Sequence, residues 1–432
     1  MDQSATLFDV IIIGAGAAGL VCAVTAGNRG HKALILEKNT SAGKKILASG
    51  GGRCNFTNLK VSSADYVSED PDFCTHALNR FKNTDFINWV QSAHIEFFTK
   101  DKGQLFCKKT SRDILNMLVT KLDKQRVTLL TSTNVLSVQH DPGRKQVTNL
   151  TLTRLNSSVM REMHPRSVDF EIPIFTVKTD NNTFSSKNLV IATGGLSCPH
   201  LGSSDLGYRL ARQFGHKVTK RHPALAGVIF PAALKNHFSK LAGVSLDAVV
   251  TTAGKSFAGG ILFTHTGLSG PAVFNASLFW NPHESLSVDF APSCEDFKNW
   301  LNGRKKTDNK KQACTVLSKI MPANLAKTLC AIAGVGKLTT GAVSHHTAAQ
   351  LSTLVKEFSF VPVATAGFAQ AEVTRGGVAT THIDPQTMES TIVRGLFFAG
   401  EVLDVTGTLG GYNLQWAWSS GYVAGLGTLK NP

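Results

Sequence analysis

The hydrophobic pattern of the first forty residues predicts a parallel β-α-β unit. Residues 7–13, LFDVIII, form a continuous apolar run rich in β-branched side chains, which is typical of a strand buried on both faces. A glycine-rich turn and a helix-like stretch over residues 17–28 follow, and residues 32–38, KALILEK, have the pattern of a second strand. This length and order are those of a dinucleotide-binding unit.

The pattern changes several times further along the chain. Residues 72–125 look helical in pieces, and one of these helices is expected to begin at a cap formed by Thr110 or Ser111. Residues 127–187 read as short strands with polar turns, which predicts an antiparallel β-meander. Residues 188–195, NLVIATGG, return to a buried strand that ends in glycines.

A shift in composition sets off residues 218–360. Strand-like runs such as GVIFPAAL, LDAVVTTAG and GGILFTH occupy residues 218–293, and a lysine-rich, helix-like section covers residues 294–360. That section holds ten Lys or Arg against four Asp or Glu. Glycine-rich, apolar sequence then returns. We therefore predict a discontinuous domain of residues 1–217 and 361–432, with an inserted domain of residues 218–360 that is β-rich first and basic and helical afterwards.

Composition limits the class of protein. The chain has 432 residues, 42% of them hydrophobic and 17% charged, which is typical of a globular protein with two or three domains. No apolar run is long enough to span a membrane, and the apolar start has no basic leader, so we expect a cytoplasmic protein. The eight cysteines are scattered without the spacing of zinc ligands, so no metal site is expected.

The net charge of +15 allows two interpretations. It belongs either to an ordinary basic protein or to one with a polyanionic partner. Among polyanions, RNA is favoured over a membrane because no basic amphipathic anchor is visible.

The glycines after the first strand follow the spacing G-x-G-x-x-G. Gly14 allows the tight turn, Gly16 lets the backbone approach a pyrophosphate, and Gly19 lets the helix pack on the sheet. The helix that begins at Ala17 presents free N–H groups to the phosphates. Glu37, at the end of the next strand, would accept hydrogen bonds from ribose hydroxyls. An acidic residue there favours NAD or FAD over NADP.

The sequence near the end of the chain favours FAD over NAD as the cofactor. Residues 395–404, GLFFAGEVLD, resemble the C-terminal FAD motif of two-dinucleotide-binding-domain flavoproteins, in which the acidic residue, here Glu401, binds the ribityl chain. The helix that follows would point its N-terminus at the flavin. Its backbone N–H groups near Tyr412, Asn413 and Leu414 would stabilise negative charge on the reduced ring. The A-T-G turn at Thr193 resembles the turn of the same proteins that lies near adenine or pyrophosphate.

The stretch SGGGRCNFTN at residues 49–58 is expected to run alongside FAD, with its glycines against the cofactor. Lys45 would supply positive charge for phosphate, and Arg53 would either do the same or hold a substrate anion. The residues predicted to bind FAD are Gly14, Gly16, Ala17, Gly19, Glu37, Lys38, Lys45, Gly51, Gly52, Arg53, Thr193, Gly194, Gly400, Glu401, Gly411, Tyr412, Asn413 and Leu414.

Four stretches together carry a family resemblance. GKKILASGGGRCNFTN, FTHTGLSGPAVF, EVTRGGVATTHIDPQTMES and AGEVLDVTGTLGGYNLQWAWSSG resemble the BaiN/RdsA (YhiN-like) family of NAD(P)/FAD-dependent flavoprotein oxidoreductases, over nearly the whole chain. The resemblance implies an α/β fold, in which a FAD-binding Rossmann-like domain carries an inserted β-barrel-like plus helical domain. Near the expected flavin edge, Cys198, His200 and Thr406 depart from the family pattern.

The resemblance also implies the reduction of a C=C bond conjugated to a carbonyl. Its substrate would be uridine in large-subunit ribosomal RNA, which becomes dihydrouridine, or alternatively a steroid- or bile-acid-like enone. A third hypothesis is a non-catalytic FAD protein that binds ribosomal RNA as an assembly factor. Because the chain has one dinucleotide fingerprint, used by FAD, NAD(P)H is expected only as a transient reductant, and electrons from a partner are the alternative.

Two residues are candidates for the proton transfer of such a reduction. The thiol of Cys54 could donate a proton if it faces the flavin, although a packing role for this small side chain is the alternative. His265 precedes a predicted helix with Ser269 as its cap and Pro271 inside it, which would place the imidazole beside a helix N-terminus. A structural loop histidine is the alternative there.

Overall fold

The first apolar run forms β1 (Leu7–Ile13), the strand between two parallel partners in a seven-stranded sheet. It pairs with β2 (Ala33–Leu36) on one side and β10 (Thr183–Ile191) on the other. The structure is a computed structural model and describes residues 7–142 and 174–428. The β-α-β unit predicted from the hydrophobic pattern is confirmed.

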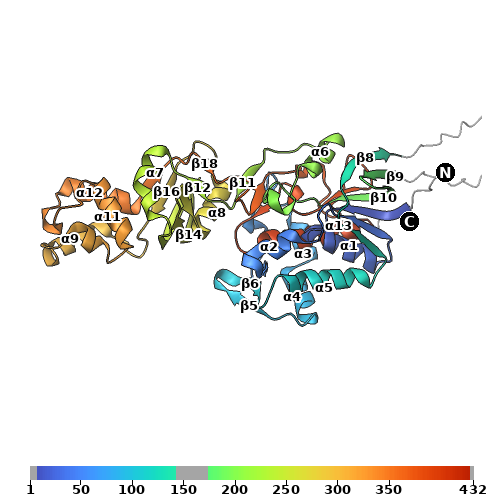
Figure 1. Cartoon of the computed structure of the whole chain (residues 1–432), viewed down its shortest axis with the longest axis horizontal. Coiled ribbons are helices and arrows are strands. Elements are labelled where there is room, and N and C mark those ends of the chain that lie inside the picture. Colours follow the sequence, from blue (N-terminus) through green and yellow to red (C-terminus); the bar gives the residue numbers. More distant parts are fainter. Residues whose placement is uncertain (1–6, 143–173, 429–432) are drawn as a thin grey trace, which may run out of the picture.

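Two helices from opposite ends of the chain touch each other backbone to backbone. They are α1 (Ala17–Asn28) and α13 (Tyr412–Gly427), which lie side by side (Figure 1). A Cβ atom at position 421 would lie 2.3 Å from the carbonyl oxygen of Ala18, so only glycine permits this approach. No helix within residues 7–142 and 174–428 combines the length and the apolar character that crossing a membrane requires.

The predicted β-meander over residues 127–187 is only partly antiparallel. Its first strand, β7 (Val127–Leu130), pairs in parallel with β2 and therefore belongs to the parallel sheet, which corrects the prediction. β8 (Val135–Asp141) and β9 (Ile174–Thr179) do pair antiparallel, and β9 continues onto the first half of β10. The predicted strand QVTNLTLTR lies outside the described residues.

The second half of β10 pairs in parallel with β20 (Leu396–Phe398), which brings the last segment of the chain beside the first. The elements between β2 and β7 pack below this sheet in Figure 1. In chain order they are α2 (Lys44–Ala48), β3 (Asn55–Asn58), β4 (Tyr66–Val67), α3 (Thr75–Arg80), α4 (Asn83–Ser92), β5 (Phe97–Lys100), β6 (Gln104–Cys107) and α5 (Arg112–Asp123).

The N-cap residue of α5 is Ser111, one of the two residues predicted, although its side chain makes no capping hydrogen bond. Its hydroxyl instead donates a hydrogen bond of 2.8 Å to the carbonyl of Leu47. The hydroxyl oxygen of Thr110 accepts from the N–H of Arg112 at 3.3 Å. Ser111 thus joins α5 to α2, a contact between residues 64 positions apart that local sequence does not reveal.

The middle of the chain forms a second seven-stranded sheet. Its strand order is β17-β16-β13-β14-β15-β12-β18. The two edge strands, β17 (Phe358–Phe360) and β18 (Ala364–Thr365), are separated by only three residues, which can span at most about 14 Å. The sheet must therefore curl until its edges approach each other, which agrees with the predicted β-barrel-like form.

The remaining elements complete this part and its connections. They are α6 (Leu206–Gln213), β11 (His222–Ala224), β12 (Val228–Ile229), α7 (Ala232–Phe238), β13 (Ser245–Thr252), β14 (Lys255–Phe263), β15 (Gly267–Ser269), α8 (Pro271–Phe279), β16 (Leu286–Asp289), α9 (Phe297–Thr307), α10 (Ala313–Leu317), α11 (Ala323–Ile332), α12 (His345–Lys356), β19 (Val373–Arg375) and β21 (Thr406–Gly407). The run GVIFPAAL is a strand only at β12, because its Pro231 begins α7.

Two large hydrophobic cores and one small cluster hold the described residues together. One core draws on positions 8–211 and 378–424, and the other on positions 228–360. A small third cluster, which includes Leu278 of α8 and Val373 of β19, joins them. The division into a domain of residues 1–217 and 361–432 and an inserted domain stays a prediction, with which these separate cores are consistent. Figure 1 shows the helices α9, α11 and α12 at the far end of the long axis.

Candidate active site

The turn after β1 shows why three glycines stand there. At Gly14, where φ is +105°, a Cβ would lie 2.5 Å from the oxygen of Ala192, and at Gly19 a Cβ would lie 1.9 Å from the oxygen of Gly14. Backbone atoms therefore leave no room for a side chain at Gly14 or Gly19. A Cβ at Gly16 would meet nothing within 4 Å, so that side of the turn is open to a phosphate. The turn therefore fits the pyrophosphate that its spacing predicted.

Glu37 lies directly against this turn. One carboxylate oxygen accepts the N–H of Ala15 at 2.9 Å, and the other accepts the backbone and side-chain N–H groups of Asn39, each at 2.8 Å. A carboxylate has about four lone-pair positions, so about one is left for a ribose hydroxyl. Lys38, which follows Glu37 in the chain, is exposed, and its predicted role in binding FAD stays a prediction.

Three segments far apart in sequence meet around Glu401. Its carboxylate pairs with the ammonium group of Lys45 from α2 at 2.6 Å and accepts the N–H of Thr374 from β19 at 2.9 Å. A Cβ at position 194 would lie 4.0 Å from the same carboxylate. The hydroxyl oxygen of Thr193 is buried and has no hydrogen-bond partner within residues 7–142 and 174–428. This set of polar groups fits the ribityl and pyrophosphate part of FAD.

The loop before α13 leaves the first backbone N–H groups of this helix uncapped. Gly411, with φ of +96°, forms the N-cap without a side-chain hydrogen bond, so the first N–H groups of the helix remain available. The side chain of Asn413 donates to the carbonyl of Gly407 at 2.8 Å and accepts its N–H at 2.9 Å. The hydroxyl of Tyr66 donates to the carbonyl of Tyr412 at 2.9 Å. These contacts fix a positively polarised helix end where the sequence predicted the flavin edge.

The glycines of residues 49–58 adopt left-handed conformations. Gly51 and Gly52 have φ of +64° and +83°, and a Cβ at either position would meet nothing within 4 Å. A bare, open backbone of this kind fits close contact with a flat ring. The side chain of Arg53 is exposed, which leaves it able to reach an anion.

Cys54 is fully buried in the core of the parallel-sheet part. Burial raises the pKa of its thiol to about 12, and a hydrogen bond with Ser49 offsets only part of that effect. Such a thiol is a weaker acid at neutral pH than an ordinary cysteine. The packing alternative is favoured, and the catalytic role of Cys54 stays a prediction that a substitution can decide.

His265 does not sit beside a helix N-terminus as expected. It is exposed in the turn between β14 and β15, while α8 begins at the other end of β15. The N-cap of α8 is Gly270, not Ser269, and its φ of +102° explains why a glycine stands there. The predicted cap at Ser269 is therefore wrong, whereas Pro271 does begin α8 as predicted. The catalytic role of His265 stays a prediction.

Several side chains near the site were not predicted. The amide oxygen of Asn275 on α8 accepts the N–H of Leu409 in the loop before α13 at 2.9 Å, and the ammonium of Lys102 donates to the carbonyl of Ala258 on β14 at 2.8 Å. Both contacts bring residues 258–275 of the predicted inserted domain against segments that surround the predicted FAD site, which we call the cofactor end. They join residues more than 130 positions apart, so no local pattern announced them.

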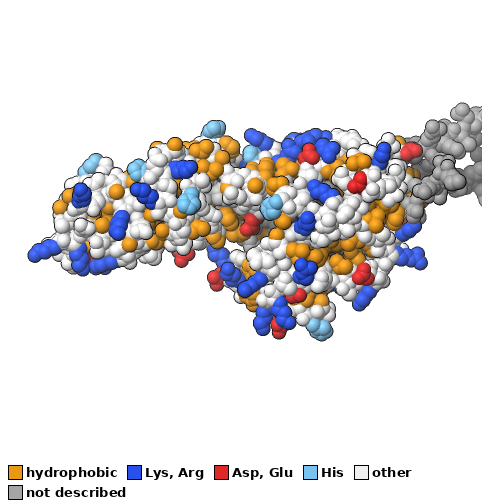
Figure 2. Space-filling view, viewed as in Figure 1, with side chains coloured by type: hydrophobic (Ala, Val, Ile, Leu, Met, Phe, Trp, Pro, Cys, Tyr) orange, Lys and Arg blue, Asp and Glu red, His pale blue; other side chains and the backbone are white. Residues whose placement is uncertain are grey.

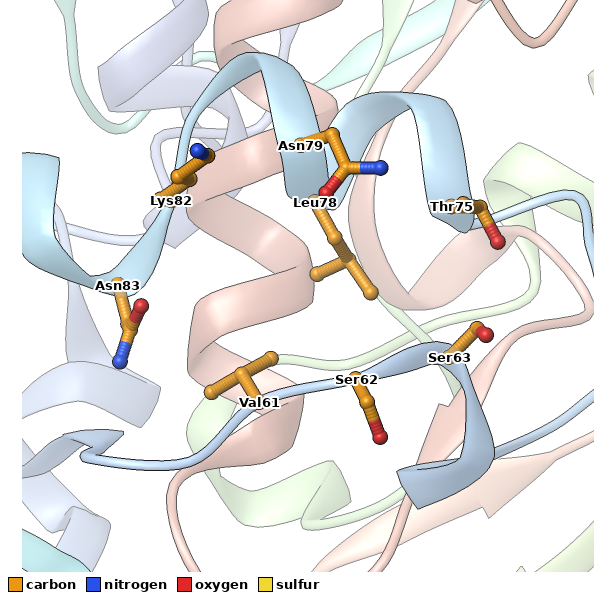
Figure 3. Close-up of a pocket in the computed structure, with 8 residues that line it drawn as sticks. All are labelled: Val61, Ser62, Ser63, Thr75, Leu78, Asn79, Lys82 and Asn83. Atoms are coloured by element: carbon orange, nitrogen blue, oxygen red, sulfur yellow. The ribbon is translucent and has the colours of Figure 1, made fainter.

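The small pocket in Figure 3 is separate from these residues. It lies between the loop at residues 61–63 and the α3–α4 corner, and Leu78 points from α3 toward that loop. Its volume is about 120 Å³, room for roughly four waters. The lining residues are Val61, Ser62, Ser63, Thr75, Leu78, Asn79, Lys82 and Asn83. No residue predicted to bind FAD is among them, and the space is too small for a dinucleotide.

These features define a FAD-binding flavoprotein of the Rossmann class. They are the glycine turn, the acidic residue at the end of β2, the Lys45–Glu401 pair and the open start of α13. Comparison with known proteins agrees. The model of the "HI0933-like protein Rossmann domain" family matches residues 8–160 and 146–427. The chain belongs to this family.

Curated relatives extend over the full chain. The ribosomal RNA dihydrouridine synthases of Escherichia coli (strain K12) and Haemophilus influenzae are each 38% identical to it, over 96% of this chain and 96% and 97% of theirs. The 3-dehydro-bile acid delta(4,6)-reductase of Clostridium scindens is 31% identical, over 98% of this chain and 99% of its own. The family resemblance found in the sequence is confirmed, and with it the class of flavin-dependent oxidoreductases.

Proposed function

We propose that this protein is a FAD-dependent reductase that converts uridine to dihydrouridine in ribosomal RNA, with the large-subunit RNA as its substrate and the cytoplasm as its location. The observation that supports this most is the 38% identity, over nearly the whole of both chains, to two ribosomal RNA dihydrouridine synthases. The net charge of +15 supports the same substrate, because a basic surface is attracted to the phosphates of RNA.

The residues of the site have distinct roles in this proposal. When bound, FAD supplies the two electrons, delivered as hydride, that saturate a C=C bond conjugated to a carbonyl. The open side of the turn at Gly16 and the start of α1 bind the pyrophosphate, and Glu37 binds the adenosine ribose. Glu401, paired with Lys45, orients the ribityl chain. The N-terminus of α13 stabilises negative charge at the pyrimidine edge of the flavin.

The reductant in the proposal is NAD(P)H, which visits the site only transiently. The chain offers one glycine turn with a helix and a following acidic residue, and the cofactor FAD uses it. Uridine then gains one hydride equivalent at its C5=C6 bond and one proton from the protein or from water, so that the reaction balances at two electrons and two protons.

The second candidate function is the reduction of a steroid- or bile-acid-like enone. The 31% identity to a 3-dehydro-bile acid delta(4,6)-reductase favours it as the alternative. Both substrates present a C=C bond conjugated to a carbonyl, so the same flavin site serves either. They differ in size and charge, which makes them separable by experiment.

The test is the reoxidation of the bound flavin. The flavin is reduced without oxygen, and its visible absorption is followed after addition of deproteinised large-subunit ribosomal RNA or of a conjugated enone acid. The proposal expects reoxidation by RNA with dihydrouridine in the product. Reoxidation by the enone acid alone would replace it with the second function. Reoxidation by neither, in protein that retains its flavin, would support a non-catalytic role.

A further inference from the structure

The excess positive charge of the helical section is confined to one end of it. Residues 297–319 contain seven Lys or Arg and one Asp, a surplus of six, which equals the surplus of the whole section 294–360. The other cations of the section are balanced by acidic residues. We call residues 297–319, which comprise α9, the loop after it, α10 and Lys319, the basic end.

The basic end contains a cluster that is built around one buried carboxylate. Asp308, 8% exposed, receives Lys311 at 2.7 Å, Lys319 at 2.8 Å and Arg304 at 3.5 Å. Hydrogen bonds from Lys311 and Lys319 hold the pKa of this carboxyl well below its usual range, so it stays charged. Three cations on one anion leave a net charge of +2, and the side chains of Lys311, Lys319 and Arg304 are 57%, 38% and 37% exposed.

The backbone under this cluster is fixed. The carbonyl of Lys311 accepts both the N–H of Thr340 at 2.8 Å and its hydroxyl at 2.9 Å, which ties the loop to the neighbouring turn. Asp308 is the C-cap residue of α9, and its N–H donates to the carbonyl of Arg304 at 2.7 Å. Cations held in place before binding lose less conformational freedom on meeting a phosphate than free side chains do.

Three further lysines lie close to the cluster in the sequence. Two of them, Lys305 and Lys306, lie on the last turn of α9, and Lys310 lies in the loop after it. Lys306 and Lys310 are exposed. Figure 2 shows Lys and Arg side chains, with few acidic ones, over the face of this end that is in view. It lies at the far end of the long axis from the parallel sheet, where α9 is labelled in Figure 1.

We infer that the basic end is a docking surface for the phosphate backbone of the RNA substrate, remote from the site of chemistry. The inference rests on the proposed function and adds to it the place where the RNA is held. Charge without base-reading groups supplies affinity and position but no sequence preference. Since the surface and the flavin site lie on different parts of the chain, the substrate is a folded RNA large enough to touch both.

The experiment compares two triple variants of the holoenzyme with equal loss of charge. One, K305A/K306A/K310A, removes three lysines of the basic end that lie outside the Asp308 cluster. The other, K124A/K327A/K337A, removes three exposed lysines elsewhere and is the matched control. Affinity for deproteinised large-subunit ribosomal RNA is measured over a range of salt concentrations. Bound flavin per chain and the melting temperature show whether each variant is folded.

The basic-end variant is expected to lose at least about tenfold in affinity at moderate salt. Its plot of log affinity against log salt should become shallower by about two, since each phosphate contact contributes about 0.7 to 0.9. The control should lose less than about threefold. Equal losses in both variants would overturn the inference in favour of overall charge, and no loss in the basic-end variant would place the RNA elsewhere. A wild-type protein that neither binds nor reduces the RNA would refute the proposed function itself.

Discussion

At the glycine turn after β1, a Cβ on Gly19 would fall 1.9 Å from a backbone oxygen, whereas at the basic end Lys306 and Lys310 are exposed side chains. The cofactor end is defined by backbone atoms that approach one another closely. The basic end is defined by charged side chains, three of which are held by the carboxylate of Asp308. The first arrangement binds one cofactor in one geometry, and the second suits a large anion whose phosphates repeat.

Substitutions at the two ends should therefore have different effects. A change at a close-packed position of the glycine turn, such as Gly19, should alter folding and flavin content together, because packing and binding share the same atoms there. A change at the basic end should alter RNA affinity alone. The predictions that follow test the cofactor side of that contrast, in order of the size of the expected effect.

The largest effect is expected from Gly19→Val. The new side chain would collide with the carbonyl of Gly14 and separate α1 from the sheet, so the free energy of unfolding should fall by about 3 kcal/mol or more and flavin should be lost. Gly16→Ala is the control, since a Cβ there meets nothing within 4 Å. It should keep the melting temperature and lose flavin affinity only. Equal melting temperatures for both variants would contradict the close-packing account.

A pH effect is expected from Asp404. Its side chain is 5% exposed, and burial raises its pKa to about 6, against a backbone hydrogen bond from Glu69 that lowers it. Between about pH 4 and pH 6 the folded protein then binds more protons at Asp404 than the unfolded chain does. The stability should therefore decrease as pH rises through this window, by at most about 3 kcal/mol.

Asp404→Asn should remove that dependence. The variant is expected to be more stable than the wild type at pH 7 and to have a flatter stability curve between pH 4 and pH 6, as chemical denaturation at several pH values would measure. Asp205→Asn, at an exposed position, is the control and should leave the curve unchanged. An unchanged slope in Asp404→Asn would show that another group titrates in this window.

A smaller effect is expected from Glu401→Gln. The amide keeps the shape of the carboxylate but loses its charge-assisted contact with Lys45, so retention of FAD should weaken about tenfold, as dialysis against free flavin would measure. Glu96→Gln is the matched control, because its partner Lys108 lies 3.6 Å away on an exposed surface. Equal flavin retention in the two variants would show that Glu401 does not contribute to FAD binding.

The smallest effect is expected from Cys54→Ala. A buried packing residue should cost about 1 kcal/mol of stability and leave the rate of flavin reoxidation within about threefold. Cys107→Ala, at a neighbouring buried thiol, is the control. If Cys54→Ala keeps its flavin but loses the reaction by about a hundredfold while Cys107→Ala does not, Cys54 is the proton donor after all.

Local pattern was sufficient where neighbours in sequence decide the structure. The β1-α1-β2 unit follows from a buried run, a glycine turn and an acidic residue, and its helix bounds agree with the predicted residues 17–28. The basic helical section was likewise visible in composition. Both rest on short-range properties: side-chain periodicity, backbone freedom and charge.

Pattern was insufficient where the partner is distant. The strand β7 has the composition of a meander strand, and only its pairing with β2, about ninety residues earlier, makes it part of the parallel sheet. Ser269 was mistaken for a cap because a left-handed Gly270 cannot be seen from residue type alone. The contact between Asn275 and Leu409, which joins α8 to the loop before α13, cannot be predicted from either local segment because the two residues are 134 positions apart.

The most direct test of the account is the return of oxidised-flavin absorption in the reduced, oxygen-free protein after addition of deproteinised large-subunit ribosomal RNA. The account predicts reoxidation that yields about one dihydrouridine per flavin, because the reaction transfers two electrons. Reoxidation by a conjugated enone acid and not by the RNA would contradict it.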